Sequence, residues 1–463
     1  MTDGALRSVT RPASVAASGT LGAAVAVVTA ACYFVAAGRS LDYDSSFTVG
    51  VFVKTGSLFD PLRRQVELNN HPLFSMIEHV VWSAGLHTET ALRVAPITFG
   101  ALTVALLTAW CANRWGLLAG LSAGAVLAAN PMFATLSRQV RGYSLLSLCA
   151  VASTLLLWHL LESAPESIPP WVPVAYVGFV AAGIATHLYG CAVLLVHAAV
   201  VAAGRELGAA WVKRWITGLT LGGLIYLDTI DKVIHTRNER TFHHAFPREA
   251  VLALLGQARV AAIALGVVVV CALWLARSHP DVLAGVAAVV LFVAFVWVVV
   301  QPQFLVVRYL VWLIPGVALA AAFFVARRPI AILIVVVGVA AMVAHEWPSW
   351  TVTEFPTAET AALVDSARVQ GMKVCGLFHT GISVSAYTRQ PDRPRTLAEL
   401  ASCDFVMGLY VSPAADRIER RAYPYAWMID AQTPVFIYSR KPRSVLTAGM
   451  PRRKDTLDTH PAT

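Results

Sequence analysis

Residues 18–37, SGTLGAAVAVVTAACYFVAA, form an apolar run without a charged side chain. A helix of about 20 apolar residues crosses the hydrocarbon core of a bilayer. The run therefore predicts a transmembrane helix. It does not resemble a cleaved signal peptide, because it is long and no small-x-small site precedes a soluble domain. The next stretch, LDYDSSFTVG at residues 41–50, places Asp42 and Asp44 at the end of this helix, where ionisable groups are costly and often functional.

The composition identifies the class of protein. The chain has 463 residues, of which 57% are hydrophobic and 14% are charged, and its mean hydropathy is +0.63. Soluble domains carry roughly 25% charged residues, so this chain is predicted to be a polytopic membrane protein. The net charge of +9 is then a topology signal, because lysine and arginine gather on the cytoplasmic side. The sequence lacks the interleaved aromatic and basic residues that are typical of nucleic-acid binding.

Eleven segments are long and apolar enough to be candidate spans. They lie near 18–37, 91–111, 117–135, 143–161, 171–187, 188–204, 214–230, 256–276, 281–300, 305–326 and 329–345. The predicted fold is an all-α polytopic membrane domain over residues 1–347, followed by a smaller domain.

The short loops predict the orientation in a plasma membrane. With the N-terminus in the cytoplasm, the cytoplasmic segments collect basic residues, as the positive-inside rule requires. These are Arg7, Arg11, Arg114, Arg205, Lys213, Arg214, Arg277, Arg327 and Arg328. An odd number of spans then places the chain after Trp347 outside the cell.

The first extracytoplasmic loop, residues 38–90, is too apolar to be a free linker. Within it, HPLFSMIEHVVWSAGL starts a helix at Pro72. Apolar residues at helical spacing predict a helix lying in the membrane interface; they are Phe74, Ile77, Val80 and Val81. Trp82 is expected to anchor this helix at the interface, with Glu78 and His79 on its wet face.

The C-terminal region predicts a small extracytoplasmic α/β domain over residues 348–441. AETAALVDSARVQGM (358–372) indicates a helix, and KVCGLF (373–378), DFVMGLYV (404–411) and PVFIYSR (434–440) indicate strands. Residues 442–463 are predicted to be disordered. Cys375 and Cys403 are the two cysteines outside the predicted spans; they either pair or remain buried thiols, and pairing would contribute about 3 kcal/mol.

Three arginines fall at the predicted outer ends of spans, against the usual bias. Arg138, Arg141 and Arg308 lie on the same side as Asp42 and Asp44. Each arginine alone could be a snorkelling side chain, but together they suit a phosphate, which the guanidinium fork binds in a bidentate manner. One carboxylate and several arginines match transfer of a sugar from a lipid-linked phosphate to a hydroxyl. The phosphate leaves readily, so only a base for the acceptor is required.

The ordered motifs also resemble a known family. YDSSFTVGVFV (43–53), NNHPLFSMIEHVVWSAG (69–85), TALRVAPITFGALTVALL (90–107) and NPMFATLSRQVRGYSLLSL (130–148) are similar to the protein-O-mannosyltransferase and aminoarabinose-transferase group. THLYG (186–190) and VVRYLVWLIPGVAL (306–319) resemble its later helices. The resemblance covers about the first 330 residues. It implies a GT-C fold and a polyprenyl-phosphate sugar as donor.

The resemblance also implies roles for single residues. Asp44 takes the place of the family's catalytic aspartate, and Ser45 stands where the family has a glutamate, which leaves open whether Asp42 compensates. Arg138, Arg141 and Arg308 match arginines near the lipid phosphate. Substrate-binding positions are expected at His71, Tyr143, His187 and Tyr309. A simple turn is the alternative reading of His71.

Other candidates carry less weight. His235, His243 and His244 lack the fixed partners of a metal site. No metal site or other cofactor is predicted. Whether a divalent cation binds near Ser45, where the family has a glutamate, stays open. Asp228 and Asp231 indicate a solvated loop end or the acceptor side.

The predicted function is that of an inverting glycosyltransferase (EC 2.4 class) at the outer face of the plasma membrane. Its expected partners are the lipid-linked donor, membrane lipids and a glycan, lipid or protein hydroxyl acceptor, with no nucleic acid. The alternatives are a transporter or flippase of a lipid-linked sugar and a non-catalytic membrane scaffold. The candidate charged residues are predicted on one side of the membrane, and the two halves of the sequence show no internal repeat. Both observations favour the enzyme over a transporter.

Overall fold

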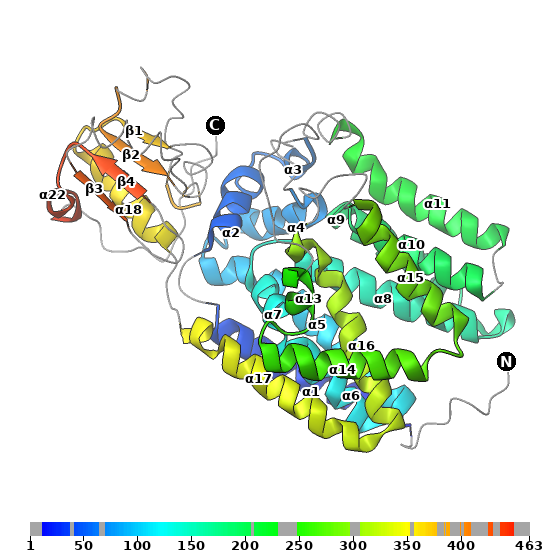
Figure 1. Cartoon of the computed structure of the whole chain (residues 1–463). Helices are drawn as coiled ribbons and strands as arrows, with labels where there is room; N and C mark the ends of the chain where they lie inside the picture. Colours follow the sequence, from blue (N-terminus) through cyan, green and yellow to red (C-terminus); the bar gives the residue numbers. More distant parts are fainter. Residues whose placement is uncertain are drawn as a thin grey trace.

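The computed structural model describes residues 12–37, 41–63, 70–204, 208–229, 248–296, 306–351, 356–376, 384, 386–388, 399, 402–408, 425–428 and 436–448. Two parts follow one another along the chain (Figure 1). A bundle of helices extends to α17, and a small domain of strands and helices comes after it.

Each of the eleven predicted spans coincides with a helix or a pair of helices. The bundle contains α1 (Val15–Val35), α5 (Glu89–Trp115), α6 (Leu117–Ala129), α7 (Pro131–Arg138), α8 (Tyr143–Glu162), α9 (Trp171–Thr186), α10 (Gly190–Ala203), α11 (Ala209–Gly223), α14 (Arg259–Leu275), α15 (Pro280–Phe295), α16 (Ile314–Arg327) and α17 (Ile332–Thr351). Among the described residues, 5 helices are long and apolar enough to cross a membrane, or up to 7 if each of two bent pairs is one span. The predicted class, a polytopic helical membrane protein, is confirmed.

The bends within these pairs have local causes. Asn130 accepts a hydrogen bond from the Phe133 N–H at 3.1 Å and so begins α7, with Pro131 in its first turn. Proline has no N–H with which to continue α6, and the two axes differ by 64°. The second pair, α13 (Arg248–Leu254) and α14, bends by 80°. There Gly256 and Gln257 adopt positive φ angles, a conformation that glycine tolerates best.

α5 lies at the centre of the largest hydrophobic core. α1, α6, α7, α8 and α16 pack against it, and its inward side chains include Val104, Leu107 and Cys111. Gly120 permits the close approach of α6, because a Cβ at this position would lie 2.6 Å from the Ala112 Cβ. Small residues allow such close helix packing in membranes.

In the described residues between α1 and α5 there are four short elements: α2 (Tyr43–Thr48), the π-helix η1 (Val49–Val53), α3 (Asp60–Arg63) and α4 (Pro72–Ser83). The helix predicted at Pro72 is confirmed, but the predicted wet face with Glu78 and His79 is wrong. Glu78, His79 and Trp82 are buried against the protein, whereas Val80 is 56% exposed. Trp82 is therefore a packing residue of this loop.

The C-terminal domain is a mixed four-stranded sheet with helices. It contains α18 (Pro356–Val369), β1 (Val374–Gly376), β2 (Phe405–Gly408), β3 (Tyr425–Met428), β4 (Phe436–Ser439) and α22 (Arg443–Ala448). The strand order is β1-β2-β4-β3, with β1 and β2 parallel and the other pairs antiparallel. The predicted helix and three strands are present, and β3 was not predicted.

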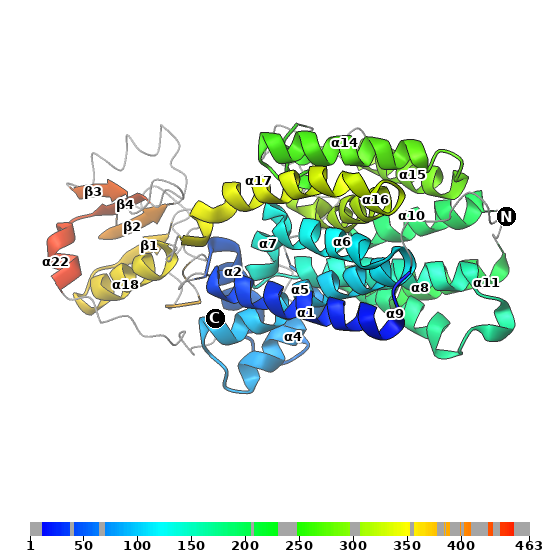
Figure 2. The ribbon, with the colours of Figure 1, turned by 90° about the horizontal axis from the view of Figure 1, so that it is seen from below.

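Two further findings concern this domain. Cys375 and Cys403 form a disulfide, so the pairing alternative is the correct one. Residues 443–448 are helical, where disorder was expected: Leu446 is buried in the domain core and its carbonyl accepts a hydrogen bond from Ser366 Oγ at 2.6 Å. Figure 2 shows the domain beyond the end of the bundle at which α2 lies.

Candidate active site

The segment with the two aspartates forms the start of α2. Asp42 is the N-cap: its Oδ1 accepts a hydrogen bond from the Ser45 N–H at 3.0 Å, and its Oδ2 accepts one from Ser45 Oγ at 2.7 Å. Burial, and then the negative charge of Asp44, raise the pKa of Asp42. Both carboxylate oxygens of Asp42 are thus engaged in capping, a role that aspartate fills well.

Asp44 points to two arginines from distant parts of the chain. Its Oδ2 lies 2.6 Å from Arg308 Nη1, and its Oδ1 lies 3.8 Å from Arg141 Nη1. Arg308 belongs to the 3₁₀ helix η6 (Val307–Leu313), and Arg141 lies in the turn between α7 and α8. Asp44 and Arg141 are 12% and 0% exposed at their side chains, whereas Arg308 is 34% exposed. Of the two arginines, Arg308 is therefore the one that is accessible from outside the protein.

Ser45 connects this carboxylate to the arginine turn. Its hydroxyl donates to Asp42 and accepts a hydrogen bond from the Val140 N–H at 2.9 Å. Val140 directly precedes Arg141, so one buried hydroxyl fixes the start of α2 against the backbone that carries Arg141. The residue at the expected glutamate position is thus a structural link. The departure from the family pattern was visible in the sequence, but this contact was not.

Arg138 has different partners from the other two arginines. Its guanidinium donates to the carbonyl oxygens of Ala134 and Ala36 at 3.1 and 2.8 Å. It also donates to Thr135 Oγ1 at 3.1 Å and to Glu346 Oε1 on α17 at 3.2 Å. The structure therefore does not place Arg138 with Asp44, Arg141 and Arg308. All its nitrogens bind the bundle itself, which supports a structural role for this residue.

The four predicted substrate-binding residues lie together. The ring centroid of His71 lies 4.7 Å from that of Tyr143 and 5.1 Å from that of His187. Tyr309 lies 4.8 Å from His187 and 6.4 Å from Tyr143. Tyr189, which sequence reasoning missed although it belongs to the THLYG motif, completes the ring cluster at 5.4 Å from Tyr309. The Arg141 guanidinium lies over the Tyr143 ring, 5.5 Å from its centroid.

The two histidines of the ring cluster are neutral near pH 7. Burial lowers the pKa of His71 well below its usual range, and the charge of Arg141 lowers it further. Burial and Arg141 lower the pKa of His187 to about 3. His187 Nδ1 accepts the Tyr189 N–H at 3.1 Å, which leaves Nε2 as an N–H donor. His71 Nδ1 has no hydrogen-bond partner among the described residues.

Gly142 brings the arginine turn close to these rings. A Cβ at this position would lie 2.7 Å from Thr186 Cγ2 and 3.0 Å from His71 Nδ1. Any side chain would displace the turn that separates Arg141 from Tyr143. This glycine is a requirement that the RGY motif contains but that spacing alone did not reveal.

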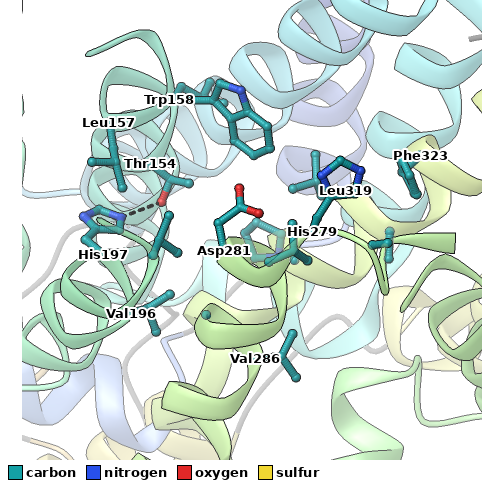
Figure 3. Close-up of a pocket in the computed structure, with 18 of the residues that line it drawn as sticks. Thr154, Leu157, Trp158, Val196, His197, His279, Asp281, Val286, Leu319 and Phe323 are labelled. Carbon is teal, nitrogen blue, oxygen red and sulfur yellow. Dashed lines mark hydrogen bonds between the residues drawn. The ribbon is translucent and has the colours of Figure 1, made fainter. Parts of the chain in front are cut away.

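The bundle also contains a large cavity, but Asp44, Arg141, Arg308 and the residues of the ring cluster do not line it. It has a volume of about 1330 Å³ and lies between α5, α8, α10, α15 and α16. Its lining includes Trp312 and Leu313 of η6, the element that carries Arg308. It also includes Trp110 and Phe323, and Arg114 and Glu162 at helix ends that the loop charges predict to be cytoplasmic. Figure 3 shows Asp281 projecting into the cavity near Trp158, with the His197–Thr154 hydrogen bond on its wall. The lining is mostly apolar.

The other candidates from the sequence lie in residues 228–244 or on α4. His235, His243, His244 and Asp231 lie outside the described residues, and so does the side chain of Asp228. No group of three or more His, Cys, Asp or Glu that could hold a metal ion occurs in the part of the chain that the structure describes. Glu78 is buried with no hydrogen-bond partner for either carboxylate oxygen among the described residues, and burial raises its pKa.

Comparison with known proteins supports the fold. No family model matches the chain, and no curated protein matches it in sequence. The structure is similar to the crystal structure of ArnT from Cupriavidus metallidurans in the apo state, with a TM-score of 0.59 and 14% identity over 93% of this chain and 99% of that chain. It is also similar to ArnT bound to undecaprenyl phosphate, with a TM-score of 0.57 and 13% identity over 92% and 98% of the two chains. The chain therefore has the ArnT fold along nearly its whole length, which confirms the fold that the motifs implied.

Proposed function

We propose that the protein is an inverting glycosyltransferase that moves a sugar from a polyprenyl-phosphate donor to a hydroxyl acceptor at the outer face of the cytoplasmic membrane. The observation that carries this proposal is the position of Asp44 between Arg141 and Arg308. One carboxylate between two guanidinium groups leaves a net positive charge, which suits an anionic phosphate.

Asp44 is the proposed general base. Asp42 is occupied as the N-cap of α2, whereas Asp44 bonds to the partly exposed Arg308. A base must lie within hydrogen-bond reach of the acceptor hydroxyl, and a carboxylate beside the phosphate site meets that need. With a single base and a good leaving group, the acceptor attacks from the face opposite the phosphate, and the anomeric configuration inverts.

Arg308 and Arg141 are the proposed phosphate ligands. Arg308 Nε has no hydrogen-bond partner among the described residues, so the side chain keeps donor capacity for an incoming phosphate. When the phosphate binds, the guanidinium can turn part of its fork from Asp44 to the ligand, which frees Asp44 to accept a proton. During departure, the same cations stabilise the charge that develops on the phosphate.

The lipid chain of the donor fits the cavity beside η6. A polyprenyl chain is apolar, and the lining of the cavity includes Trp312 and Leu313, a few residues after Arg308. Its volume of about 1330 Å³ exceeds the range of roughly 300–1,000 Å³ that is usual for small-molecule pockets. The ArnT structure with undecaprenyl phosphate supports a polyprenyl phosphate as the ligand class.

The ring cluster is the proposed sugar site. Neutral His71 and His187, with Tyr143 and Tyr309, offer imidazole and phenol groups to the hydroxyls of a sugar next to the phosphate. Because these histidines carry no charge, they add no further attraction for the phosphate and leave that role to the arginines.

The outer-face location rests on the loop charges. The basic residues of the short loops support a cytoplasmic N-terminus, and with that orientation α2 and the disulfide-linked domain lie outside. A transporter would instead be expected to hold its ionisable residues near the middle of the bilayer.

Release of polyprenyl phosphate tests the proposed function. Purified protein in lipid nanodiscs is given a polyprenyl-phosphate sugar and a panel of glycan, lipid and peptide acceptors. Glycosyl transfer predicts free polyprenyl phosphate together with a glycosylated acceptor of inverted configuration. A protein that carries labelled donor across a proteoliposome membrane without releasing phosphate would be a transporter.

A further inference from the structure

The C-terminal domain exchanges side chains with the loop that carries the candidate base. Ala386 and Tyr387 of the C-terminal region pack in the hydrophobic cluster that contains Leu41 and Val49. In the other direction Tyr43, which stands between Asp42 and Asp44, packs against the core of the C-terminal domain. The two parts of the chain therefore interlock next to α2.

The phenol of Tyr387 joins three parts of the chain: its own segment, the residues before α2 and the start of α5. The hydroxyl accepts a hydrogen bond from the Leu41 N–H at 2.5 Å and donates one to Glu89 Oε1 at 2.8 Å. Leu41 is fully buried and Glu89 nearly so, and Glu89 is the first residue of α5. Burial raises the pKa of Tyr387 well above its usual range, so the phenol keeps the proton that it donates.

The segment around Tyr387 is fixed on both sides. The Lys54 ammonium at the end of η1 donates to the Ala386 carbonyl at 3.2 Å. On the other side, the Thr388 hydroxyl donates to Asp365 of α18 and accepts a bond from Arg368 Nη1 at 2.9 Å. The segment that carries Tyr387 is thus held by Lys54 at the end of η1 and by α18.

We propose that Tyr387 is a positioning residue. By holding the Leu41 amide against Glu89, it fixes the start of α2 and so sets Asp44 relative to Arg141 and Arg308. Leu41 directly precedes Asp42, the N-cap, and Asp44 lies in the first turn of α2. The catalytic consequence rests on the proposed function, whereas the contact itself does not. Misplacing a reacting group by about 1 Å can cost about a hundredfold in rate.

The test compares Tyr387→Phe with the full-length wild-type protein in nanodiscs. Phenylalanine keeps the packing and removes both hydrogen bonds. Hydrogen exchange at the amide of Leu41 is expected to become about tenfold faster, as for loss of one buried hydrogen bond. Turnover is expected to fall by about ten- to a hundredfold, while the KM for donor stays within about twofold because Arg141 and Arg308 are unchanged.

Two further variants separate positioning from general damage. Ser366→Ala breaks the hydrogen bond to the Leu446 carbonyl inside the C-terminal domain without touching the phenol bridge or its segment, and it should leave both exchange at Leu41 and turnover unchanged. Glu89→Ala removes the acceptor from the bundle side and should reproduce the effects of Tyr387→Phe, whereas Glu89→Gln retains an acceptor oxygen and should be milder.

The outcomes are distinct. Unchanged exchange at Leu41 in Tyr387→Phe overturns the bridge, and faster exchange with normal turnover overturns its positioning role. Equal effects of Ser366→Ala and Tyr387→Phe also overturn it, because the damage is then not specific to the bridge. If the wild-type protein transfers no sugar, the proposed function fails, and the exchange measurement still decides whether Tyr387 holds α2.

Discussion

At the scale of residues, Arg138 and Arg141 have different partners although they are close in the sequence. Arg138 and Arg141 stand three positions apart, yet Arg138 pairs with Glu346 on α17 and Arg141 faces Asp44. The partner of Arg138 lies 208 positions away, so no local pattern could assign it. By contrast, the His71, Tyr143, His187 and Tyr309 set was found through ordered motifs, because each motif carries one ring to the same place.

Arg308 and Arg138 should respond differently to loss of charge. Arg308→Leu is expected to fold and insert but to lose donor affinity and turnover, with partial rescue by Arg308→Lys, since a point charge cannot replace a bidentate fork. Arg138→Leu removes the buried guanidinium that pairs with Glu346, whose side chain is 9% exposed, and should cost about 3–5 kcal/mol of stability. Donor-binding titrations and thermal unfolding in detergent separate the two effects. Normal donor affinity in Arg308→Leu would mean that Arg308 is only a snorkelling side chain.

His187 should make the protein sensitive to acid. Its pKa is about 3 in the folded protein and about 6.5 when unfolded, so the unfolded chain binds more protons between these values. The stability is fully present above about pH 6.5 and is lost as the pH falls towards 3. At pH 5 the loss from this group amounts to at most about 2 kcal/mol. Melting curves from pH 7.5 to 4.5 should be flatter for His187→Gln than for wild type, and equal slopes would contradict the buried neutral state.

At the scale of elements, α4 shows why some structure could not be predicted. Hydrophobic periodicity assigned its apolar residues to one face, but Glu78 and His79 are buried and Val80 is exposed. In a membrane protein the lipid is as apolar as a core, so an apolar side chain does not distinguish inside from outside. The existence of α4 and its start at Pro72 follow from local chemistry that the environment does not alter, and both were predicted.

The same contrast applies to the spans and to the C-terminal domain. The long apolar runs specify their helices regardless of partners, so all eleven segments were found. β3 was not predicted because its sequence, YAWM, is short and its strand pairs only with β4, which is a tertiary contact. The helix at residues 443–448 escaped because its stability comes from packing Leu446 into the core of the domain.

Ser45 and Ser46 offer a matched pair for testing the α2 link. Both are fully buried, but Ser45 Oγ holds Asp42 and the Val140 N–H, whereas Ser46 Oγ has no hydrogen-bond partner among the described residues. Ser45→Ala leaves a buried N–H unsatisfied and should cost about 1–3 kcal/mol, together with turnover. Ser46→Ala should be neutral or slightly stabilising. Thermal unfolding and steady-state rates compare the two, and similar losses in both would contradict the link.

At the scale of the whole molecule, the large cavity is the proposed place of the donor's lipid chain. Gly316 of α16 lines the cavity, and a Cβ there would meet nothing within 4 Å. Gly316→Leu should therefore fill space without a clash and improve helix propensity. If the cavity holds the lipid chain, the KM for a long-chain donor should rise about tenfold or more, with little change for a short-chain donor.

Gly178 of α9 is the control for that variant. It too has nothing within 4 Å of a Cβ, but it does not line the cavity. Gly178→Leu should leave the KM for both donors unchanged. Equal KM values in wild type and Gly316→Leu for the long-chain donor would place the lipid elsewhere.

The central claim is that Asp44 takes the proton of the acceptor while two arginines hold the phosphate. The direct test is polyprenyl-phosphate release by Asp44→Asn under saturating donor, beside Asp42→Asn. Asparagine keeps the shape of Asp44 and removes its basicity, so donor should still bind while turnover falls by about a hundredfold or more. Asp42→Asn should be mild, since asparagine caps a helix as well as aspartate does. Ordinary turnover in Asp44→Asn, or loss of activity confined to Asp42→Asn, would contradict the account.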